Sequence, residues 1–119
     1  MFDGRDPLYV QIADQIRSDV LSGALRAEEQ VMSTTQYATT FRINPATAAK
    51  AFTELVDEGV LYKRRGIGMF VAEGAQARLV AARREAFRDD HLRPLMARAR
   101  ALGIAPEQLA QMIGKEAAQ

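Results

Sequence analysis

The stretch from residue 33 to residue 58, STTQYATTFRINPATAAKAFTELVDE, decides the fold because it contains two helix starts close together. Ser33 and Gln36 have the spacing of a capping box, in which each side chain bonds the backbone N–H of the other residue. Asn44 and Pro45 form the second start, since Asn caps helices well and proline suits the first helical position. The sequence therefore predicts two helices joined by a very short turn, which is the arrangement of a helix-turn-helix.

Apolar residues within this stretch predict which faces of the two helices are buried. The first helix is about two turns long. The second extends to about residue 58, where Gly59 can end it. The residues expected on the buried faces are Tyr37, Ala38, Phe41, Ala48, Ala51, Phe52, Leu55 and Val56.

The flanking segments add a helix before this pair and a hairpin after it. Apolar residues at four-residue spacing predict a helix over 8–22. The short polar stretch that Leu25 and Val31 flank is expected to be a loop. Two short runs, 60–63 and 69–71, have strand composition, and the glycines between them suit a tight turn. The apolar residues of the helix over 8–22 are Leu8, Ile12, Ile16 and Val20.

The C-terminal part is predicted to be helical. A long helical segment follows Gly74, and Pro94 should kink it because proline lacks the amide proton. A last helix begins at Pro106. These helices have little core of their own to cover, so their apolar stripe predicts a two-fold dimer interface. The alternative is that the stripe packs back onto the helix over 8–22 of the same chain. The expected interface residues are Leu92, Leu95, Met96, Ala99, Leu102, Leu109, Met112 and Ile113.

The composition excludes several classes of protein. Hydrophobic residues make up 48% of the 119 residues and charged residues 26%, as in an ordinary globular protein. Because there is no cysteine, disulfides and thiolate metal sites are excluded. No stretch approaches the ~20 apolar residues of a membrane span, and residues 1–6 lack the basic region and apolar core of a secretion signal. We therefore expect a cytoplasmic protein with no membrane partner.

Basic charge is concentrated in two segments, although the net charge is only +1. Residues 61–72 contain three basic residues and no acid, and residues 76–100 contain seven arginines against three acids. Such clustering suggests an anionic partner, with solvated faces as the alternative. The Arg-rich segment 78–88 is expected to be a solvated helix face rather than an extension of a phosphate-binding surface. Its arginines are Arg78, Arg83, Arg84 and Arg88.

Catalysis and metal binding have little support in the sequence. The single His91 has no second histidine at zinc-binding spacing. Gly66 and Gly68 are too few for a dinucleotide fingerprint, and no serine has a nearby base to activate it. We therefore expect no enzyme activity, no catalytic residue, no metal and no cofactor.

The helix-turn-helix and the basic hairpin together favour binding to double-stranded DNA. A recognition helix enters the major groove with its N-terminal side chains toward base edges, where Thr and Lys can contact bases or phosphates. A basic hairpin tip can follow phosphates or enter the minor groove. For each signal alone, the alternative is a structural helix without DNA contact or a soluble turn that merely carries charge. Because the basic hairpin directly follows the helix-turn-helix, the two signals indicate one surface. The expected contact residues are Pro45, Ala46, Thr47, Lys50, Arg64, Arg65 and Gly66.

Several motifs between residues 7 and 71 carry a family resemblance. They are Pro7-Leu8-Tyr9-Val10-Gln11-Ile12, Gly23-Ala24-Leu25, Ile43-Asn44-Pro45-Ala46-Thr47, Ala51-Phe52-x-Glu54-Leu55-x-x-x-Gly59 and Arg64-Arg65-Gly66-x-Gly68-x-Phe70-Val71. In this order and spacing they resemble the DNA-binding domain of the GntR transcription regulators. The Asn-Pro helix start, with only about 45 residues after the hairpin, is similar to the short, YtrA-type branch.

The resemblance implies a winged helix-turn-helix that binds a palindromic operator as a homodimer, usually as a repressor. The family's second helix usually begins Pro-Ser-x-Arg, and that Arg contacts DNA; here Ser33 is followed by Thr35 at the Arg position. Ser33, Thr35 and Arg42 complete the expected DNA contacts. With fewer base contacts, specificity rests more on DNA shape. The branch has no large effector domain, so a small-molecule effector, if one exists, would use a small site near the dimer helices.

The predicted fold class is mainly α with a small β-hairpin. It consists of a winged helix-turn-helix DNA-binding domain over 1–73, followed by a short α-helical dimerisation segment over 74–119. The alternative function is a winged-helix protein–protein interaction module without specific DNA binding. The alanine-rich recognition helix is compatible with this alternative, because alanine side chains offer only methyl groups. An RNA-binding role is weaker, because the hairpin lacks exposed stacking aromatics.

Overall fold

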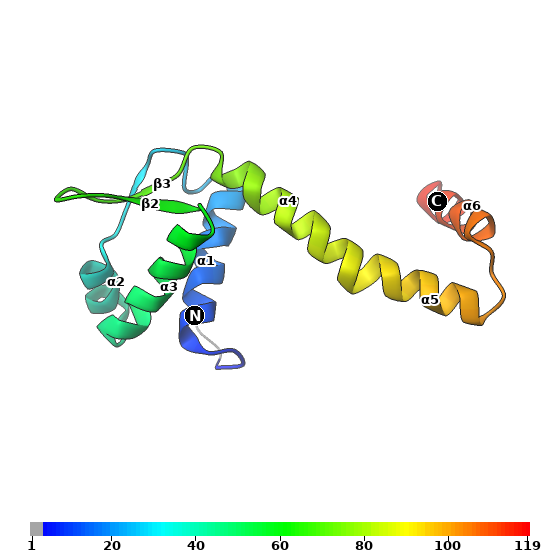
Figure 1. Cartoon of the computed structure of the whole chain (residues 1–119), viewed down its shortest axis with the longest axis horizontal. Coiled ribbons are helices and arrows are strands. Elements are labelled where there is room, and N and C mark those ends of the chain that lie inside the picture. Colours follow the sequence, from blue (N-terminus) through cyan, green and yellow to red (C-terminus); the bar gives the residue numbers. More distant parts are fainter. Residues whose placement is uncertain (1–3) are drawn as a thin grey trace. The chain divides into compact units, whose positions relative to one another are not determined.

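The N-terminal part of the chain folds around three helices and a small sheet (Figure 1). The structure, a computed structural model, describes residues 4–119; the part of the secretion-signal expectation that concerns residues 1–3 lies outside them. The chain divides into two compact units, Met1–Ala81 and Ala82–Gln119. The first unit contains α1 (Leu8–Ser22), β1 (Gln30–Val31), α2 (Thr34–Phe41), α3 (Pro45–Asp57), β2 (Leu61–Arg64), β3 (Gly68–Val71) and the start of α4 (Ala75–Phe87).

The predicted helix-turn-helix is confirmed, and both of its caps are present. The Ser33 hydroxyl accepts from the backbone N–H of Gln36 at 3.0 Å, and Gln36 Oε1 accepts from the backbone N–H of Ser33 at 3.2 Å. At the second start, Asn44 Oδ1 accepts from the backbone N–H of Ala46 at 2.8 Å, one residue after Pro45. Both helices therefore begin where local side-chain chemistry places their starts.

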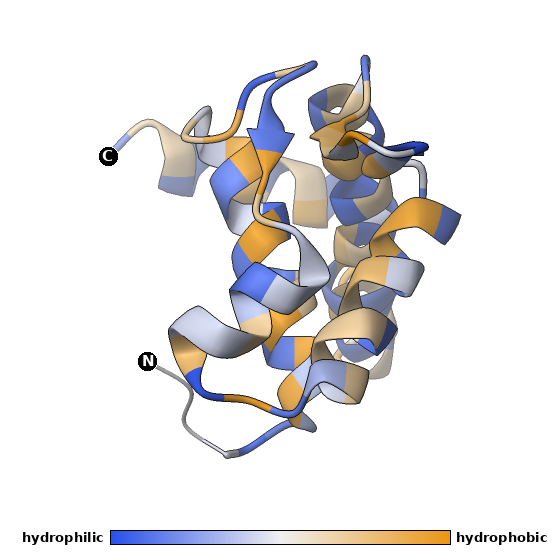
Figure 2. Ribbon diagram, turned by 90° about the vertical axis from the view of Figure 1, so that its left-hand side faces the viewer, coloured by the Kyte–Doolittle hydropathy of each residue, from blue (hydrophilic) through white to orange (hydrophobic). Residues whose placement is uncertain are grey.

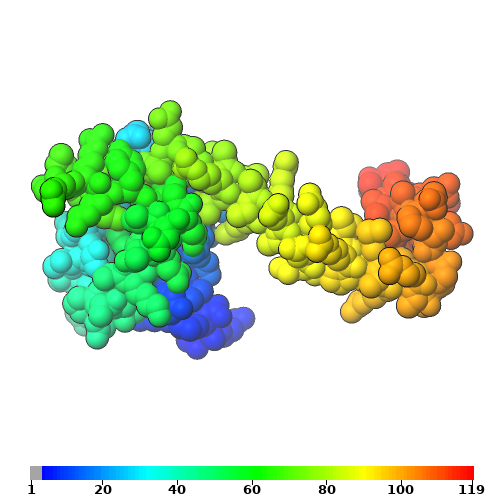
Figure 3. Space-filling model, in the orientation of Figure 1, coloured from blue at the N-terminus to red at the C-terminus, as the bar shows by residue number. Residues whose placement is uncertain are grey.

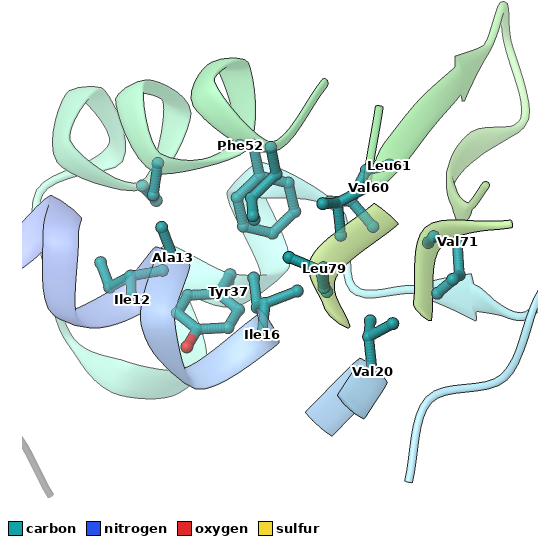
Figure 4. Packing of buried hydrophobic residues seen from close by; sticks show 14 of the residues in the cluster. Ile12, Ala13, Ile16, Val20, Tyr37, Phe52, Val60, Leu61, Val71 and Leu79 are labelled. Carbon is teal, nitrogen blue, oxygen red and sulfur yellow. The ribbon is translucent and has the colours of Figure 1, made fainter. Parts of the chain in front are cut away.

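The core of the first unit is built on close packing of α1 against α3. Ala13 of α1 and Ala48 and Ala51 of α3 are completely buried, and their small side chains let the two helix backbones approach closely. Tyr37 joins α2 to this core through an edge-to-face contact with Phe52, with ring centroids 5.6 Å apart. Figure 4 shows that side chains from the three helices, the sheet and α4 meet in one cluster.

The polar side of α1 also contacts α3, through an ion pair. The helices carry both hydrophobic and hydrophilic residues around their circumference (Figure 2). On α1, Arg17 binds the Glu58 carboxylate through two nitrogens, with Nε donating to Oε1 at 2.9 Å. The same guanidinium pairs with Asp14 at 2.6 Å. Because two-pronged guanidinium–carboxylate contacts are directional as well as strong, this pair fixes α1 against the C-terminal end of α3.

The expected hairpin is part of a three-stranded antiparallel sheet with strand order β1-β3-β2. β2 pairs with β3 so that Arg64 lies opposite Gly68, and β1 pairs with β3 so that Gln30 lies opposite Phe70. The expectation that the polar stretch between Leu25 and Val31 is a loop is therefore wrong at Gln30, which belongs to β1. A strand of two residues is too short to show the alternation by which strands are recognised in sequence.

The four arginines of segment 78–88 are exposed, as expected, but Arg78 is also anchored by hydrogen bonds. Its Nη1 donates to the carbonyl of Gly59, just after α3, at 2.9 Å and to that of Glu73 at 3.0 Å. Ala75 and Leu79, on the same turns of α4, are buried in the core. The beginning of α4 is therefore part of the packing of the first unit.

The second unit consists of the remainder of α4 and three further helical segments. They are the π-helical turn η1 (Arg88–Leu92), α5 (Arg93–Ala101) and α6 (Pro106–Ala117). In η1 the backbone N–H of Arg93 bonds the carbonyl of Arg88, and this wider turn makes room for the ring of Pro94. The division into domains at 1–73 and 74–119 stays a prediction. The boundary between the two compact units falls later in the sequence, after Ala81 within α4. Within the described residues, no helix is both long enough and apolar enough to cross a bilayer.

Replacement of Leu55 by alanine should destabilise the first unit strongly, because Leu55 is fully buried between the helices. We expect a loss of about 2–5 kcal/mol in the free energy of unfolding. Its neighbour Val56 is 38% exposed, so Val56→Ala is the matched control and should cost no more than about 0.5 kcal/mol. Urea unfolding followed by circular dichroism measures both, and equal losses would contradict the packing described above.

Candidate nucleic-acid interface

The first turns of α3 present short side chains to solvent. Pro45, Ala46, Ala49 and Lys50 are exposed, and Thr47 is half-buried. Apart from the Lys50 ammonium and the Thr47 hydroxyl, these residues offer methyl and methylene groups. Such a surface can approach a partner closely and can contact the methyl groups of thymine, while it makes few hydrogen bonds.

A groove lies between the N-terminus of α2, the exposed side of α3 and the hairpin. It brings Ser33, next to the start of α2, together with Lys63 of β2 across residues of α3. Ser33 is the only predicted contact residue among those that line it, and its hydroxyl is already used in the helix cap. The lining residues are Ser33, Thr34, Ala49, Phe52, Thr53, Val56, Lys63, Gly68 and Met69.

Lys50 does not belong to this groove, because its side chain lies against α1. Its Nζ is 4.0 Å from the centroid of the Tyr9 ring. An ammonium over an aromatic face is attracted by the negative charge density of the ring. Tyr9 therefore positions the Lys50 ammonium, and it was not among the residues predicted for the site.

The three basic residues of the hairpin face in different directions. Successive side chains of a strand point to opposite faces of the sheet. Lys63 lines the groove beside α3, whereas Arg64 lies on the other face over Phe70. Arg65 follows at the exposed tip. Sequence reasoning omitted Lys63 from the contact residues, although alternation from the buried Leu61 would have placed it on the α3 side.

Four side chains on the outer face of the sheet form what we call the wing cluster: Glu28, Tyr62, Arg64 and Phe70. The Arg64 guanidinium carbon is 4.7 Å from the centroid of the Phe70 ring and 5.9 Å from that of Tyr62. Glu28 accepts a short hydrogen bond from the Tyr62 hydroxyl, and its Oε2 is 3.7 Å from Nη2 of Arg64. The hydrogen bond to Glu28 raises the pKa of Tyr62 above its usual value.

The tip of the hairpin projects from the first unit (Figure 3). Gly66 has a φ of 74°, and the backbone N–H of Ile67 bonds the carbonyl of Arg64 at 3.0 Å, which closes a tight turn. A residue with a Cβ is strained at this φ, so glycine suits the position. Arg65 and Ile67 are exposed here, and the Arg65 charge is therefore accessible to a partner.

The remaining predicted contact residues lie on or just after α2. Thr35 is exposed on the first turn of α2, and Arg42 is exposed at its C-terminal end. Arg42 has a left-handed φ of 54°, which ends the helix and starts the turn toward Asn44. Neither residue lines the groove. They lie at the two ends of α2 and extend the candidate contact surface beyond the groove.

Most residues of the expected dimer interface are exposed within the single chain. Leu102 is 76% exposed, whereas Ala99 is only 6% exposed and Leu109 is half-buried. The second unit therefore already buries part of its apolar stripe between α5 and α6. The remaining members of the set, all at least partly exposed, are Leu92, Leu95, Met96, Met112 and Ile113.

His91 and its acidic neighbours form no metal centre. In the part of the chain that the structure describes, no group of three or more His, Cys, Asp or Glu side chains could hold a metal ion. The His91 ring instead lies 5.4 Å from the ring of Phe87, one helical turn earlier. The second unit thus offers apolar surface rather than metal ligands.

Comparisons with known proteins match this geometry. The sequence profile of the bacterial regulatory proteins of the gntR family matches residues 8–71, which is the segment from α1 to β3. The HTH-type transcriptional repressor YtrA of Bacillus subtilis is 31% identical over 107 residues, which cover 90% of this chain and 82% of YtrA.

Solved structures show the same likeness. A GntR-family transcriptional regulator from Bacteroides thetaiotaomicron superposes with a TM-score of 0.75 at 31% identity, covering 93% of this chain and 96% of that one. The DNA-binding domain of AraR, crystallised in complex with operator ORX1, superposes with a TM-score of 0.56 at 28% identity. That superposition covers 60% of this chain and 93% of the AraR domain.

Replacement of Glu28 by alanine should lower the pKa of Tyr62. The carboxylate stabilises the protonated hydroxyl by accepting its hydrogen bond and opposes formation of the phenolate, so both effects disappear in the variant. NMR titration of the tyrosine ring signals at alkaline pH measures the change. Tyr37 is the internal control, since burial is the main cause of its raised pKa; an unchanged Tyr62 would show that the contact is absent in solution.

Proposed function

The chain belongs to the gntR family of bacterial regulatory proteins, and we propose that it represses transcription by binding double-stranded operator DNA as a homodimer. The observation that carries the proposal is the family match over residues 8–71, which spans every element around the groove. A repressor of this kind acts on the bacterial chromosome and hence in the cytoplasm. The relatives are transcription regulators, and we assign this chain no catalytic step.

In this proposal the N-terminal turns of α3 enter the major groove. Pro45 and Ala46 approach the bases with apolar surface, and Thr47 donates or accepts a hydrogen bond. Lys50 reaches a guanine or a phosphate from its position beside Tyr9. Asn44 caps the helix, so its first backbone N–H groups are partly satisfied and its direction is fixed.

The remaining contacts of the proposed complex are electrostatic. Arg65 and Gly66 at the hairpin tip follow a phosphate backbone or enter the minor groove, and Arg64 lies beside them. Lys63 faces the groove and adds a charge between the hairpin and α3. Ser33, Thr35 and Arg42 border the same surface around α2. These contacts contribute affinity for any duplex, so sequence discrimination rests on α3 and on DNA shape.

The second unit supplies the proposed dimer contact. Its exposed apolar residues, including Leu102 and Ile113, would be covered by the same residues of a second copy across a two-fold axis. A two-fold dimer places two recognition helices about one turn of DNA apart, which matches a palindromic operator. A small-molecule effector near these helices is not assigned.

The apolar lining of the groove favours a second candidate, a protein–protein interaction module without specific DNA binding. Lys63 is the only charged residue among the lining residues, and Phe52, Val56 and Met69 are typical of a protein contact. The two candidates differ in salt dependence. Binding to DNA phosphates weakens steeply as salt rises, whereas an apolar protein contact does not.

Lys50→Ala and Arg65→Ala test the DNA-binding surface. With a duplex selected from a random pool by the wild-type protein, Lys50→Ala should weaken binding by about 1–3 kcal/mol and relax sequence preference. Arg65→Ala should weaken binding to all duplexes alike and reduce the slope of log K against log salt by about one. Lys115→Ala, on α6, is the control. Fluorescence anisotropy measures each, and unchanged binding for both variants would remove this surface from the proposal.

Leu102→Glu tests the dimer, since Leu102 is the most exposed large apolar residue of the second unit. A buried, unpaired carboxylate at a two-fold interface should shift the protein toward monomers in sedimentation velocity. Ala24→Glu, at an exposed loop position of the first unit, should leave the assembly unchanged. If the Leu102 variant sediments like the wild type, this face is not the interface.

A further inference from the structure

Glu28 has a strained backbone at a position where no regular element requires it. Its φ is 67°, one of two positive φ values among the non-glycine residues that the structure describes. Side chains with a Cβ rarely adopt this region, and such residues cluster where function constrains the backbone. Its backbone N–H donates to the carbonyl of Val71 at 2.8 Å, which pins the strained residue to the end of β3.

The strained backbone places the Glu28 carboxylate beside the basic hairpin. The carboxylate accepts the hydrogen bond of the Tyr62 hydroxyl, and its Oε2 is 3.7 Å from Nη2 of Arg64. Arg64 is at the same time stacked over Phe70, 4.7 Å from the ring centroid. A carboxylate and an aromatic face therefore hold the guanidinium next to the hairpin tip, at the residue that precedes Arg65.

A carboxylate binds a guanidinium with the chemistry by which a DNA phosphate would bind it. Both are oxyanions that accept charge-assisted N–H bonds, and a single N–H group cannot donate fully to both. The Arg64 and Glu28 side chains are each about half exposed, at 51% and 50%. The pair is thus open to competition, and a pair this exposed is weak enough to exchange.

We propose that Glu28 is an internal competitor for Arg64, which holds its guanidinium in the free protein and releases it to a phosphate when DNA binds. This inference rests on the proposed function. The ion pair with Glu28 offsets part of the Arg64 charge and holds one side of the guanidinium, so a phosphate has to compete with the carboxylate and Glu28 lowers the affinity for duplexes through Arg64. Tyr62 keeps the carboxylate in place, and the Phe70 ring holds the guanidinium over its face.

Glu28→Gln is the variant that tests the proposal. Glutamine removes the charge but retains a carbonyl oxygen for the Tyr62 hydroxyl, so the loop should keep its fold; thermal unfolding checks this. We expect affinity for both a selected and a random duplex to rise about two- to five-fold, the range set by a half-exposed ion pair.

Glu29→Gln is the matched control. Glu29 carries the same charge one residue away, and its carboxylate accepts from the backbone N–H of Arg26 at 3.1 Å rather than contacting Arg64. If the Glu28 effect were only a change in net charge, both variants would gain equally, and that result would overturn the proposal. A loss of affinity in Glu28→Gln would also overturn it, because Glu28 would then position Arg64 for DNA.

A double-mutant cycle with Arg64→Gln makes the test specific. In the Arg64→Gln background, Glu28→Gln should no longer raise affinity, since there is no guanidinium to release. A gain that persists in that background contradicts the proposal while leaving the proposed function intact. A wild-type protein that binds no duplex would instead overturn the proposed function itself, and this inference with it.

Discussion

The close contact between α1 and α3 is the constraint on which the rest of the first unit depends. Ala13, Ala48 and Ala51 are fully buried where the two helices meet, and larger side chains there would push the helix axes apart. Arg17 and Glu58 add a two-pronged ion pair at one end of the same contact. Because one side of α3 packs against α1, the opposite side lines the groove and is accessible to a partner.

The hairpin shows how strand geometry divides a run of like charges. Lys63, Arg64 and Arg65 are consecutive in the sequence, yet they face the groove, the outer side of the sheet and the tip respectively. Each position has a different electrostatic environment. Among the residues that the structure describes, Arg64 is the one of the three with an ion pair to a carboxylate. A basic cluster in sequence is therefore not one basic patch in space, and the contribution of each charge to binding has to be considered separately.

The second unit differs from the first in how it is stabilised. It consists of the end of α4, η1 and the short helices α5 and α6, with one buried residue, Ala99, and a set of exposed large apolar residues. The helix start at Pro106 has no capping side chain at Ala105; Gln108 Oε1 accepts from the Ala105 N–H at 2.8 Å instead. A segment with so little core of its own gains little stability from burial within the single chain.

The sequence by itself determined the helices of the first unit, their caps and the family, because caps and amphipathic spacing are local properties of the chain. It did not predict β1, whose two residues carry no periodicity, or the role of Arg78, whose acceptor at Gly59 lies on a different element. Alternation along β2 predicts that Lys63 and Arg64 point to opposite faces, but the groove that Lys63 lines and the position of Glu28 beside Arg64 were decided by the tertiary structure alone. Those contacts join residues far apart in the chain, and no local pattern encodes a distance between them.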